Sequence, residues 1–208
     1  DRTTDFIVSN QHLQLVDGLA TSKRFKNIKL LNYVDEYDPD VQKQFAAMTY
    51  RLSLDAYLVV FRGTDDTLIG WKEDFHMTYM DHVPAQKRAA SYLHHVMKEF
   101  PKGRFLVAGH SKGGNLATYA CSYLPDSLFE RVDAIYSYDA PGLNKAIIET
   151  EGYQRTSPYI RRFVPQGSIV GMMLEVPEPT TIVKSRALGG FAQHDAFTWE
   201  IKDRSEEH

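Results

Sequence analysis

Cysteine is nearly absent from this chain, since Cys121 is the only one among 208 residues. An internal disulfide is therefore excluded, and a reducing compartment is indicated. We expect a cytoplasmic protein, while the start at Asp1 rather than Met leaves a removed signal peptide open. Cys121 lies on the apolar face of an expected helix, so we expect a buried core thiol and not a reactive one.

Charge of one sign and long apolar runs are also lacking. The formal net charge is −3, with 24 basic and 27 acidic residues interspersed along the sequence. Nucleic acid or an anionic membrane requires a one-sided basic field, so neither is an expected partner. No apolar run approaches the roughly 18 residues of a membrane span, so no transmembrane segment is expected. Length and a hydrophobic content of 43% suit one globular domain over residues 1–208.

The motifs that bind common cofactors are missing as well. The sequence contains no H-E-x-x-H, no paired C-x-x-C, no P-loop and no G-x-G-x-x-G. Each of these patterns supplies metal ligands or a phosphate cradle. We therefore expect neither a metal ion nor a nucleotide cofactor, and any chemistry must come from the side chains of the chain itself.

What the chain does contain is the stretch Gly109-His110-Ser111-Lys112-Gly113. The apolar run 105–108 before it is typical of a buried strand, and the apolar positions after it share one face of a helix. In that context G-x-S-x-G is the nucleophile-elbow pattern. A serine on so sharp a turn has a strained backbone, so its neighbours must lack colliding side chains. The alternative is a glycine turn with a surface serine, and the strand–helix context favours the nucleophile.

Strand and helix patterns alternate along the rest of the chain. The runs 44–52 and 56–61 predict an antiparallel hairpin. Further strands are expected at 26–34, 105–108, 132–138, 159–164 and 181–185, with helices at 5–19, after Pro84, after the elbow and at 143–151. The run 168–174 fits a strand or a helix start. This alternation predicts an α/β fold, with a mostly parallel central sheet, helices on both faces and an N-terminal antiparallel hairpin.

Chemistry in such a sheet gathers at the carboxyl ends of its strands. Ser111 needs a base to take its proton, and histidine does this best near neutral pH. Among the eight histidines, His194 combines a late position, a glycine-bearing loop and a preceding strand. His76 and His82 remain alternatives, whereas His110 adjoins the nucleophile on a turn where neighbouring side chains point apart. We interpret His194 as the base.

The acid of the site is expected to be Asp139, which ends a strand before Pro141-Gly142. Its task would be to accept the far N–H of the histidine and to fix the tautomer. The alternative role is a bond to its own turn backbone, which is common before proline and glycine. Asp195 adjoins His194 and is badly aimed for that bond. The chain order Ser…Asp…His is the order of α/β-hydrolases.

Two N–H donors are expected for the oxyanion that forms during attack. One is the backbone N–H of Lys112, directly after the nucleophile, and the other comes from the turn at Gly63-Thr64, where the Thr64 hydroxyl can add a bond. A Ser–Lys dyad is disfavoured because neighbours diverge at an elbow. We expect the Lys112 ammonium to face solvent and to bias the mouth of the site toward anionic ligands.

These blocks together resemble known lipases. Residues 59–64, Trp71, Asp74 and residues 109–114 are similar to blocks of the fungal-type (class 3) lipases. A fuller set resembles a lipase-like family of α/β-hydrolases; it comprises residues 61–66, 109–115, 138–142, 168–171 and 193–195, and the similarity runs from about Phe45 to Trp199. The resemblance implies an α/β-hydrolase fold with Ser111 as nucleophile, His194 as base, and Thr64 with Lys112 as the oxyanion hole.

The sequence departs from that pattern at the acid. Class 3 lipases take it from the turn after the strand that matches 159–164, but here that turn is Pro165-Gln-Gly-Ser168, without a carboxylate. Asp139 lies one strand earlier, as in pancreatic-type lipases. The resemblance also implies that residues 65–81 lie over the site as a lid, with ordinary packing of their apolar side chains as the alternative.

The sequence therefore predicts a metal-free serine hydrolase that cleaves carboxylic esters through a Ser-His-Asp triad and an acyl-enzyme. The expected partner is a small-molecule or lipid acyl ester. A thioesterase or peptidase on the same triad stays open, because specificity depends on the shape of the pocket. So does a binding protein without turnover, because fold alone does not establish activity. Oligomeric state and acyl-chain preference are not determined by the sequence.

Overall fold

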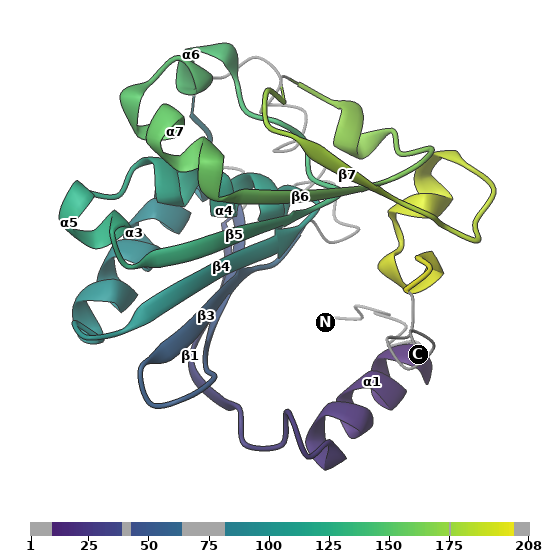
Figure 1. The fold of residues 1–208 in the computed structure, drawn as a ribbon, viewed down its shortest axis with the longest axis horizontal. Coiled ribbons are helices and arrows are strands. Elements are labelled where there is room, and N and C mark those ends of the chain that lie inside the picture. Colours follow the sequence, from purple (N-terminus) through teal and green to yellow (C-terminus); the bar gives the residue numbers. More distant parts are fainter. Residues whose placement is uncertain (1–9, 39–42, 64–81, 175, 202–208) are drawn as a thin grey trace, which may run out of the picture.

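The computed structural model describes residues 10–38, 43–63, 82–174 and 176–201. Within them, seven strands form one sheet in the order β1-β2-β3-β4-β5-β6-β7 (Figure 1). The strands are β1 (Lys29–Asp38), β2 (Lys43–Arg51), β3 (Ala56–Phe61), β4 (Arg104–His110), β5 (Val132–Tyr138), β6 (Ile160–Pro165) and β7 (Thr180–Val183). The strand order equals the chain order, so each connection joins neighbouring strands.

The sheet is antiparallel at its N-terminal edge and parallel elsewhere. β1 pairs with β2 and β2 with β3 in antiparallel fashion, while β3 to β7 run parallel. The hairpin between β2 and β3 closes with a bond of 2.8 Å from Leu52 N to Ala56 O. The expected hairpin and the mostly parallel sheet are confirmed. Because the strands are parallel, the carboxyl ends of β3 to β6 share one edge.

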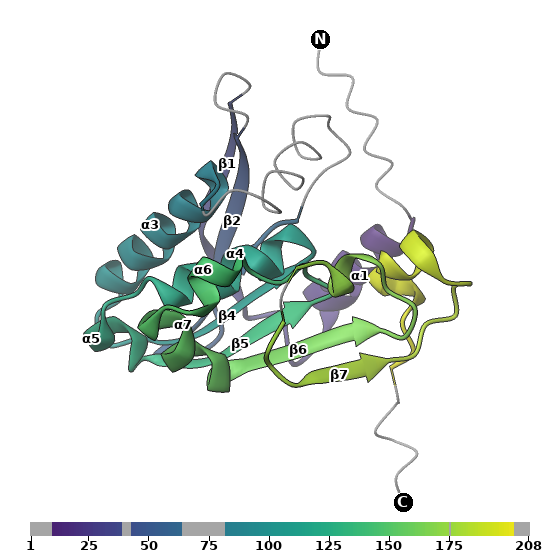
Figure 2. The same ribbon diagram turned by 90° about the horizontal axis from the view of Figure 1, so that it is seen from above.

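Most helices cover one face of the sheet. They are α3 (Pro84–Glu99), α4 (Lys112–Ser122), α5 (Asp126–Phe129), α6 (Lys145–Ile148) and α7 (Glu151–Thr156). All residues of α4 are buried, because this helix packs on β4 and β5 between α3 and α7 (Figure 2). The core between this layer and the sheet includes Val59, Phe105, Val107, Leu116 and Ile135. The elbow helix is therefore the central element of the layer.

On the opposite side of the sheet lie α1 (Asn10–Thr21), which stands apart from the strands, and the 3₁₀ helices η3 (Gly190–His194) and η4 (Ala196–Thr198) (Figure 1). Helices thus lie on both sides, as expected, but unevenly. Every residue of α1 is exposed, including Leu13 and Val16. The ring of His12 meets the ring of Phe197 at 4.7 Å between centroids. The C-terminal segment, which carries His194, therefore occupies the side of the sheet away from α4.

Two sequence expectations about helices have clear outcomes. Cys121 is buried in α4, and burial raises the pKa of its thiol, so the core role is confirmed. The short helix expected over 143–151 is α6, which ends at Ile148, and a second helix that was not predicted, α7, begins at Glu151. They separate because the Thr150 side chain accepts a bond of 3.2 Å from Tyr153 N and so begins a new helix. Among the residues described, no helix is both long and apolar enough to span a membrane.

Candidate active site

Ser111 occupies a strained turn between β4 and α4. Its backbone has φ 57° and ψ −135°, a conformation that costs a non-glycine residue on the order of 1–3 kcal/mol. A Cβ on Gly109 would lie 2.1 Å from the carbonyl carbon of Gly113, and one on Gly113 would lie 2.1 Å from Phe61 O. Neither position can therefore hold a side chain. The local geometry is that of the elbow expected from the sequence.

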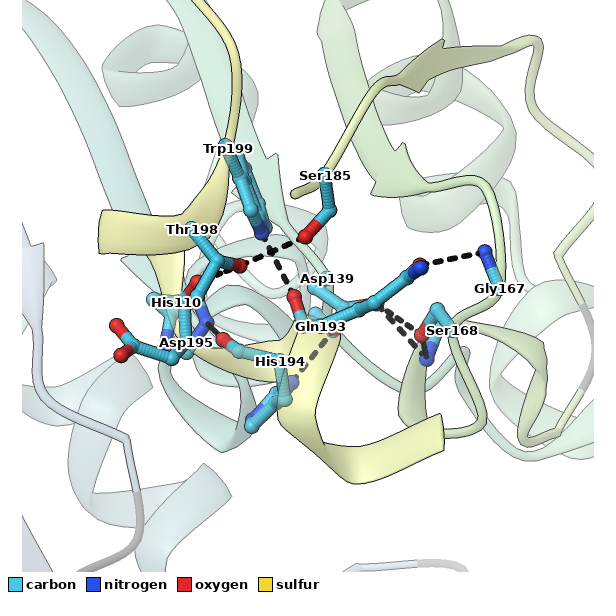
Figure 3. A network of polar contacts seen from close by, with 12 residues as sticks. His110, Asp139, Gly167, Ser168, Ser185, Gln193, His194, Asp195, Thr198 and Trp199 are labelled. Carbon is cyan, nitrogen blue, oxygen red and sulfur yellow. Dashed lines mark hydrogen bonds and ion pairs between the residues drawn. The ribbon is translucent and has the colours of Figure 1, made fainter. Parts of the chain in front are cut away.

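Asp139 and His194 are in direct contact. Asp139 Oδ2 lies 2.6 Å from His194 Nδ1, with the carboxylate fully buried and the imidazole 24% exposed (Figure 3). The carboxylate accepts a hydrogen bond from Nδ1–H, so the neutral ring carries its hydrogen on Nδ1 and leaves Nε2 as the acceptor. The structure thus brings together the expected acid and base, in the tautomer that a general base requires.

The second carboxylate oxygen of Asp139 has partners of its own. Oδ1 accepts from the Ser168 hydroxyl and from the Gly171 N–H at 3.1 Å. Asp139 has φ +43°, a region that aspartate tolerates better than most residues. The donors come from the loop after β6, so the side chain does not serve its own turn backbone. Together with His194 they offset the cost of burying a charged carboxylate.

The backbone also brings the elbow toward this pair. Ser111 N donates to Tyr138 O at 2.9 Å, which ties the elbow to the residue before Asp139. His110, next to Ser111, contacts His194 directly. Between these described residues, however, no hydrogen bond joins the Ser111 hydroxyl to His194 Nε2. Such bonds are often long in unliganded enzymes and tighten with substrate.

The His194 loop is fastened by its neighbours. Gln193 is buried; its Oε1 accepts from Gly167 N at 2.7 Å and its Nε2 donates to Ala187 O at 2.9 Å. Trp199 Nε1 donates to Gln193 O at 2.8 Å (Figure 3). These bonds connect the loop to the turn after β6 and fix where the imidazole lies. Asp195 Oδ1 instead accepts from Phe197 N at 2.9 Å, so Asp195 caps η4, as its poor aim in the sequence suggested.

The expected oxyanion site is described only in part. Thr64 and residues 65–81, the expected lid, lie outside the described residues. Gly63 lies against the elbow, because a Cβ there would be 2.8 Å from His110 O and 3.1 Å from Ser111 Cβ. The turn after β3 therefore adjoins Ser111, which is where the second donor was expected.

The prediction that the Lys112 ammonium faces solvent is wrong. Lys112 is 1% exposed, and its Nζ donates to Gln44 O at 3.1 Å. The reason is its place at the start of a helix that is buried along its whole length, so the side chain runs back toward β2. Lys112 thus supports the sheet instead of presenting a charge at the mouth of the site.

Sequence reasoning missed several residues at this site. His110 is not a predicted site residue, yet its ring lies beside that of His194, with 4.4 Å between centroids and a tilt of 33° between the rings. Burial lowers the pKa of His110, and the charge of His194 acts in the same direction. Ser168 and Gly171 belong to the block 168–171 that resembles the lipase-like family, but no role is predicted for them from the sequence. Their signal was a polar Ser-x-x-Gly turn at the carboxyl end of a strand.

No group of three His, Cys, Asp or Glu side chains is arranged to hold a metal ion within residues 10–38, 43–63, 82–174 and 176–201.

The sheet order and the strained elbow define the class of the protein, a lipase-like α/β-hydrolase fold. Its family follows from the sequence. A family model described as Mbeg1-like matches residues 19–207, and the chain belongs to the Mbeg1-like family. No curated protein is significantly similar to the chain in sequence.

Solved structures of lipases share the fold at low identity. The lipase from Rhizopus microsporus var. chinensis has a TM-score of 0.57 at 17% identity, over 76% of this chain and 62% of that chain. The Rhizomucor miehei lipase propeptide complex has a TM-score of 0.55 at 17% identity, over 85% of this chain and 65% of that chain. A mutant form of MDLA from Penicillium cyclopium has a TM-score of 0.57 at 16% identity, over 85% of this chain and 70% of that chain. The chain spans less than two thirds of the length of the first two.

Proposed function

We propose that this protein is a serine hydrolase that cleaves carboxylic esters through an acyl-enzyme. The observation that carries the proposal is the buried Asp139–His194 hydrogen bond of 2.6 Å, at the same sheet edge as the strained turn that holds Ser111. An imidazole held by a buried carboxylate beside a serine on an elbow is the arrangement that activates a hydroxyl. The fold shared with lipases supports the same reaction class.

The proposed reaction has two matching halves. His194 Nε2 takes the Ser111 proton while Oγ bonds to the ester carbonyl carbon, and the carbonyl electron pair moves onto oxygen. When that pair returns, the bond to the leaving oxygen breaks, and His194 gives it the proton, so an alcohol departs. Water then repeats the sequence on the acyl-serine and releases the acid. Throughout, Asp139 holds Nδ1–H and balances the imidazolium charge.

The oxyanion would be bound where the elbow meets α4. The backbone N–H of Lys112 follows the nucleophile at the first turn of this helix, where the helix dipole is positive. Thr64 is proposed as the second donor, since Gly63 already adjoins Ser111. Donors of this kind stabilise the charge that develops during attack.

Apolar acyl groups suit the surroundings of the pair. Exposed apolar side chains lie on the loop after β6, which contacts Asp139, and on the loop that carries His194; they are Ile169, Met172, Met173, Leu188 and Phe191. The loops adjoin, since a Cβ on Gly190 would lie 3.8 Å from Ile169 Cδ1. We call these five side chains the apolar rim. An exposed apolar patch beside a reactive centre favours esters with hydrocarbon acyl chains as substrates.

Labelling with a fluorophosphonate tests the nucleophile. The wild-type protein should form a covalent adduct, and Ser111→Ala should form none. Ser122→Ala is the matched control, because it removes a buried hydroxyl from the same helix, one that donates to Thr118 O at 2.9 Å, and should label normally. A folded wild-type protein that stays unlabelled would contradict the proposal.

A binding protein without turnover is the competing function. The observation in its favour is the missing hydrogen bond between Ser111 and His194 in the described residues. It predicts a folded chain inert to the probe, so the labelling experiment decides between the two. If the chain labels, turnover of matched oxygen esters, thioesters and peptides identifies the bond that is cleaved, since the triad alone does not.

A further inference from the structure

The loop after β6 lacks a carboxylate but supplies donors to the carboxylate of the neighbouring strand. Ser168 Oγ contacts Asp139 Oδ1 from a position 29 residues further along the chain. We propose that Ser168 is a positioning residue of the site, which orients Asp139 and acts on the reaction only through it. This inference rests on the proposed hydrolase function, and it assigns a role to a side chain that contacts the carboxylate of Asp139.

The direction of the Ser168 hydrogen bond follows from its other partner. Gly171 N donates to Ser168 Oγ at 2.8 Å, so this oxygen already accepts a bond. Its own proton is then free to point at Asp139 Oδ1, which as a carboxylate oxygen only accepts. Asp139 Oδ2 is left for His194 Nδ1. Each carboxylate oxygen thus has its own set of donors, and rotation of the carboxylate about its χ2 angle is restrained.

The loop that carries Ser168 is held independently of Asp139. Arg162 is 2% exposed, and its Nη2 donates to Ala140 O at 2.8 Å and to Gly171 O. One guanidinium therefore connects the loop after β5 with the loop after β6. Burial lowers the pKa of Arg162, while the nearby charges of Glu178 and Asp139 act in the opposite direction.

Gly171 supplies the second donor to Asp139 Oδ1, and it can do so because it has no side chain. A Cβ at this position would lie 2.5 Å from Asp139 Oδ1 and 2.7 Å from Val164 Cγ1. Only glycine allows the backbone N–H to approach the carboxylate. The Ser168 hydroxyl is therefore the one donor to Oδ1 that can be removed without disturbing the backbone, which makes it the position to test.

The test compares Ser168→Ala and Ser168→Thr with wild type, on a soluble ester and by proton NMR. The hydrogen between His194 Nδ1 and Asp139 should resonate far downfield of the amide signals, and this signal reports the geometry of the pair. Ser168→Ala should lower kcat by about 10-fold or more with KM changed by less than about 2-fold, and should shift the downfield signal. Ser168→Thr keeps a hydroxyl and should restore both.

The matched control is again Ser122→Ala, which should leave kcat and the downfield signal as in wild type. If Ser168→Ala does not fold, Ser168→Thr and Ser168→Val replace it, because they share a shape and differ only in the hydroxyl. Equal kcat and equal downfield signals in the hydroxyl-bearing and hydroxyl-free variants would overturn the inference. The NMR signal needs no substrate, so it tests Ser168 even if the chain fails the fluorophosphonate test of its proposed function.

Discussion

His110 Nε2 lies 2.8 Å from the backbone oxygen of His194, and the two rings are 4.4 Å apart between centroids. Since a carbonyl oxygen only accepts, Nε2 of His110 carries a hydrogen and donates it. The residue before Ser111 thus holds the loop of the proposed base. It does so as a neutral ring, because burial and the charge of His194 both lower its pKa.

Stability should fall in acid partly because of His110. Its pKa in the folded protein is below the ordinary value of 6.5, so the unfolded chain binds more protons as the pH drops below that value. The folded state therefore loses stability as the pH falls from 6.5 toward the lowered pKa. His110→Gln keeps an N–H donor but cannot titrate, so its Tm should decline less over this interval. His95→Gln, at an exposed position, should follow wild type. Parallel Tm curves for wild type and His110→Gln would refute this account.

Replacement of Asp139 by asparagine should nearly abolish turnover. Asparagine has the same shape, but its amide cannot hold the Nδ1–H tautomer of His194 in the same way, and losses of about 10⁴-fold in kcat are typical. The measurement is the initial rate of ester hydrolysis at saturating substrate. Asp195→Asn is the control, since Asp195 caps η4 and should change kcat little. Comparable losses in the two variants would place the acid elsewhere.

A methyl group added at the elbow should lower the free energy of unfolding far more than one added in an exposed helix. Gly113→Ala would bring a Cβ to 2.1 Å from Phe61 O, and a backbone atom cannot give way. We expect a loss of more than about 3 kcal/mol in the free energy of unfolding, together with loss of labelling. Gly18→Ala, in the exposed helix α1, meets nothing within 4 Å. It should stabilise by up to about 1 kcal/mol. Denaturant titrations measure both changes, and a tolerated Gly113→Ala would contradict the elbow geometry.

The apolar rim should control the choice of acyl chain. Leu188 is fully exposed and Phe191 is 60% exposed. Leu188→Ser with Phe191→Ser should lower kcat/KM for long-chain esters by about 10-fold, since two apolar contacts are lost, and should spare acetate esters. Leu54→Ser, at the exposed hairpin turn, is the control. An equal effect on short and long esters would show that the rim does not contact the acyl group.

Much of the fold and of the candidate site could be predicted from the sequence, because local patterns specify it. The elbow needs Gly109 and Gly113, and alternating strands and helices place Ser111 and Asp139 at one edge. Tertiary neighbours were not readable. Ser168 reaches Asp139 only because β5 and β6 are adjacent, and His110 meets His194 only because the C-terminal segment covers that side of the sheet. The burial of Lys112 depends on how completely α4 is enclosed, which its own sequence does not reveal.

The Gln193 side chain holds the His194 loop through hydrogen bonds to Gly167 and Ala187, and loss of these bonds on heating should inactivate the protein. The segment that bears the proposed base contributes no strand to the sheet, so it can detach while the remaining architecture persists. On warming, the rate of ester hydrolysis should therefore fall at a temperature below the main melting transition. Cooling from that window should restore it fully, because the detached segment returns to an intact platform.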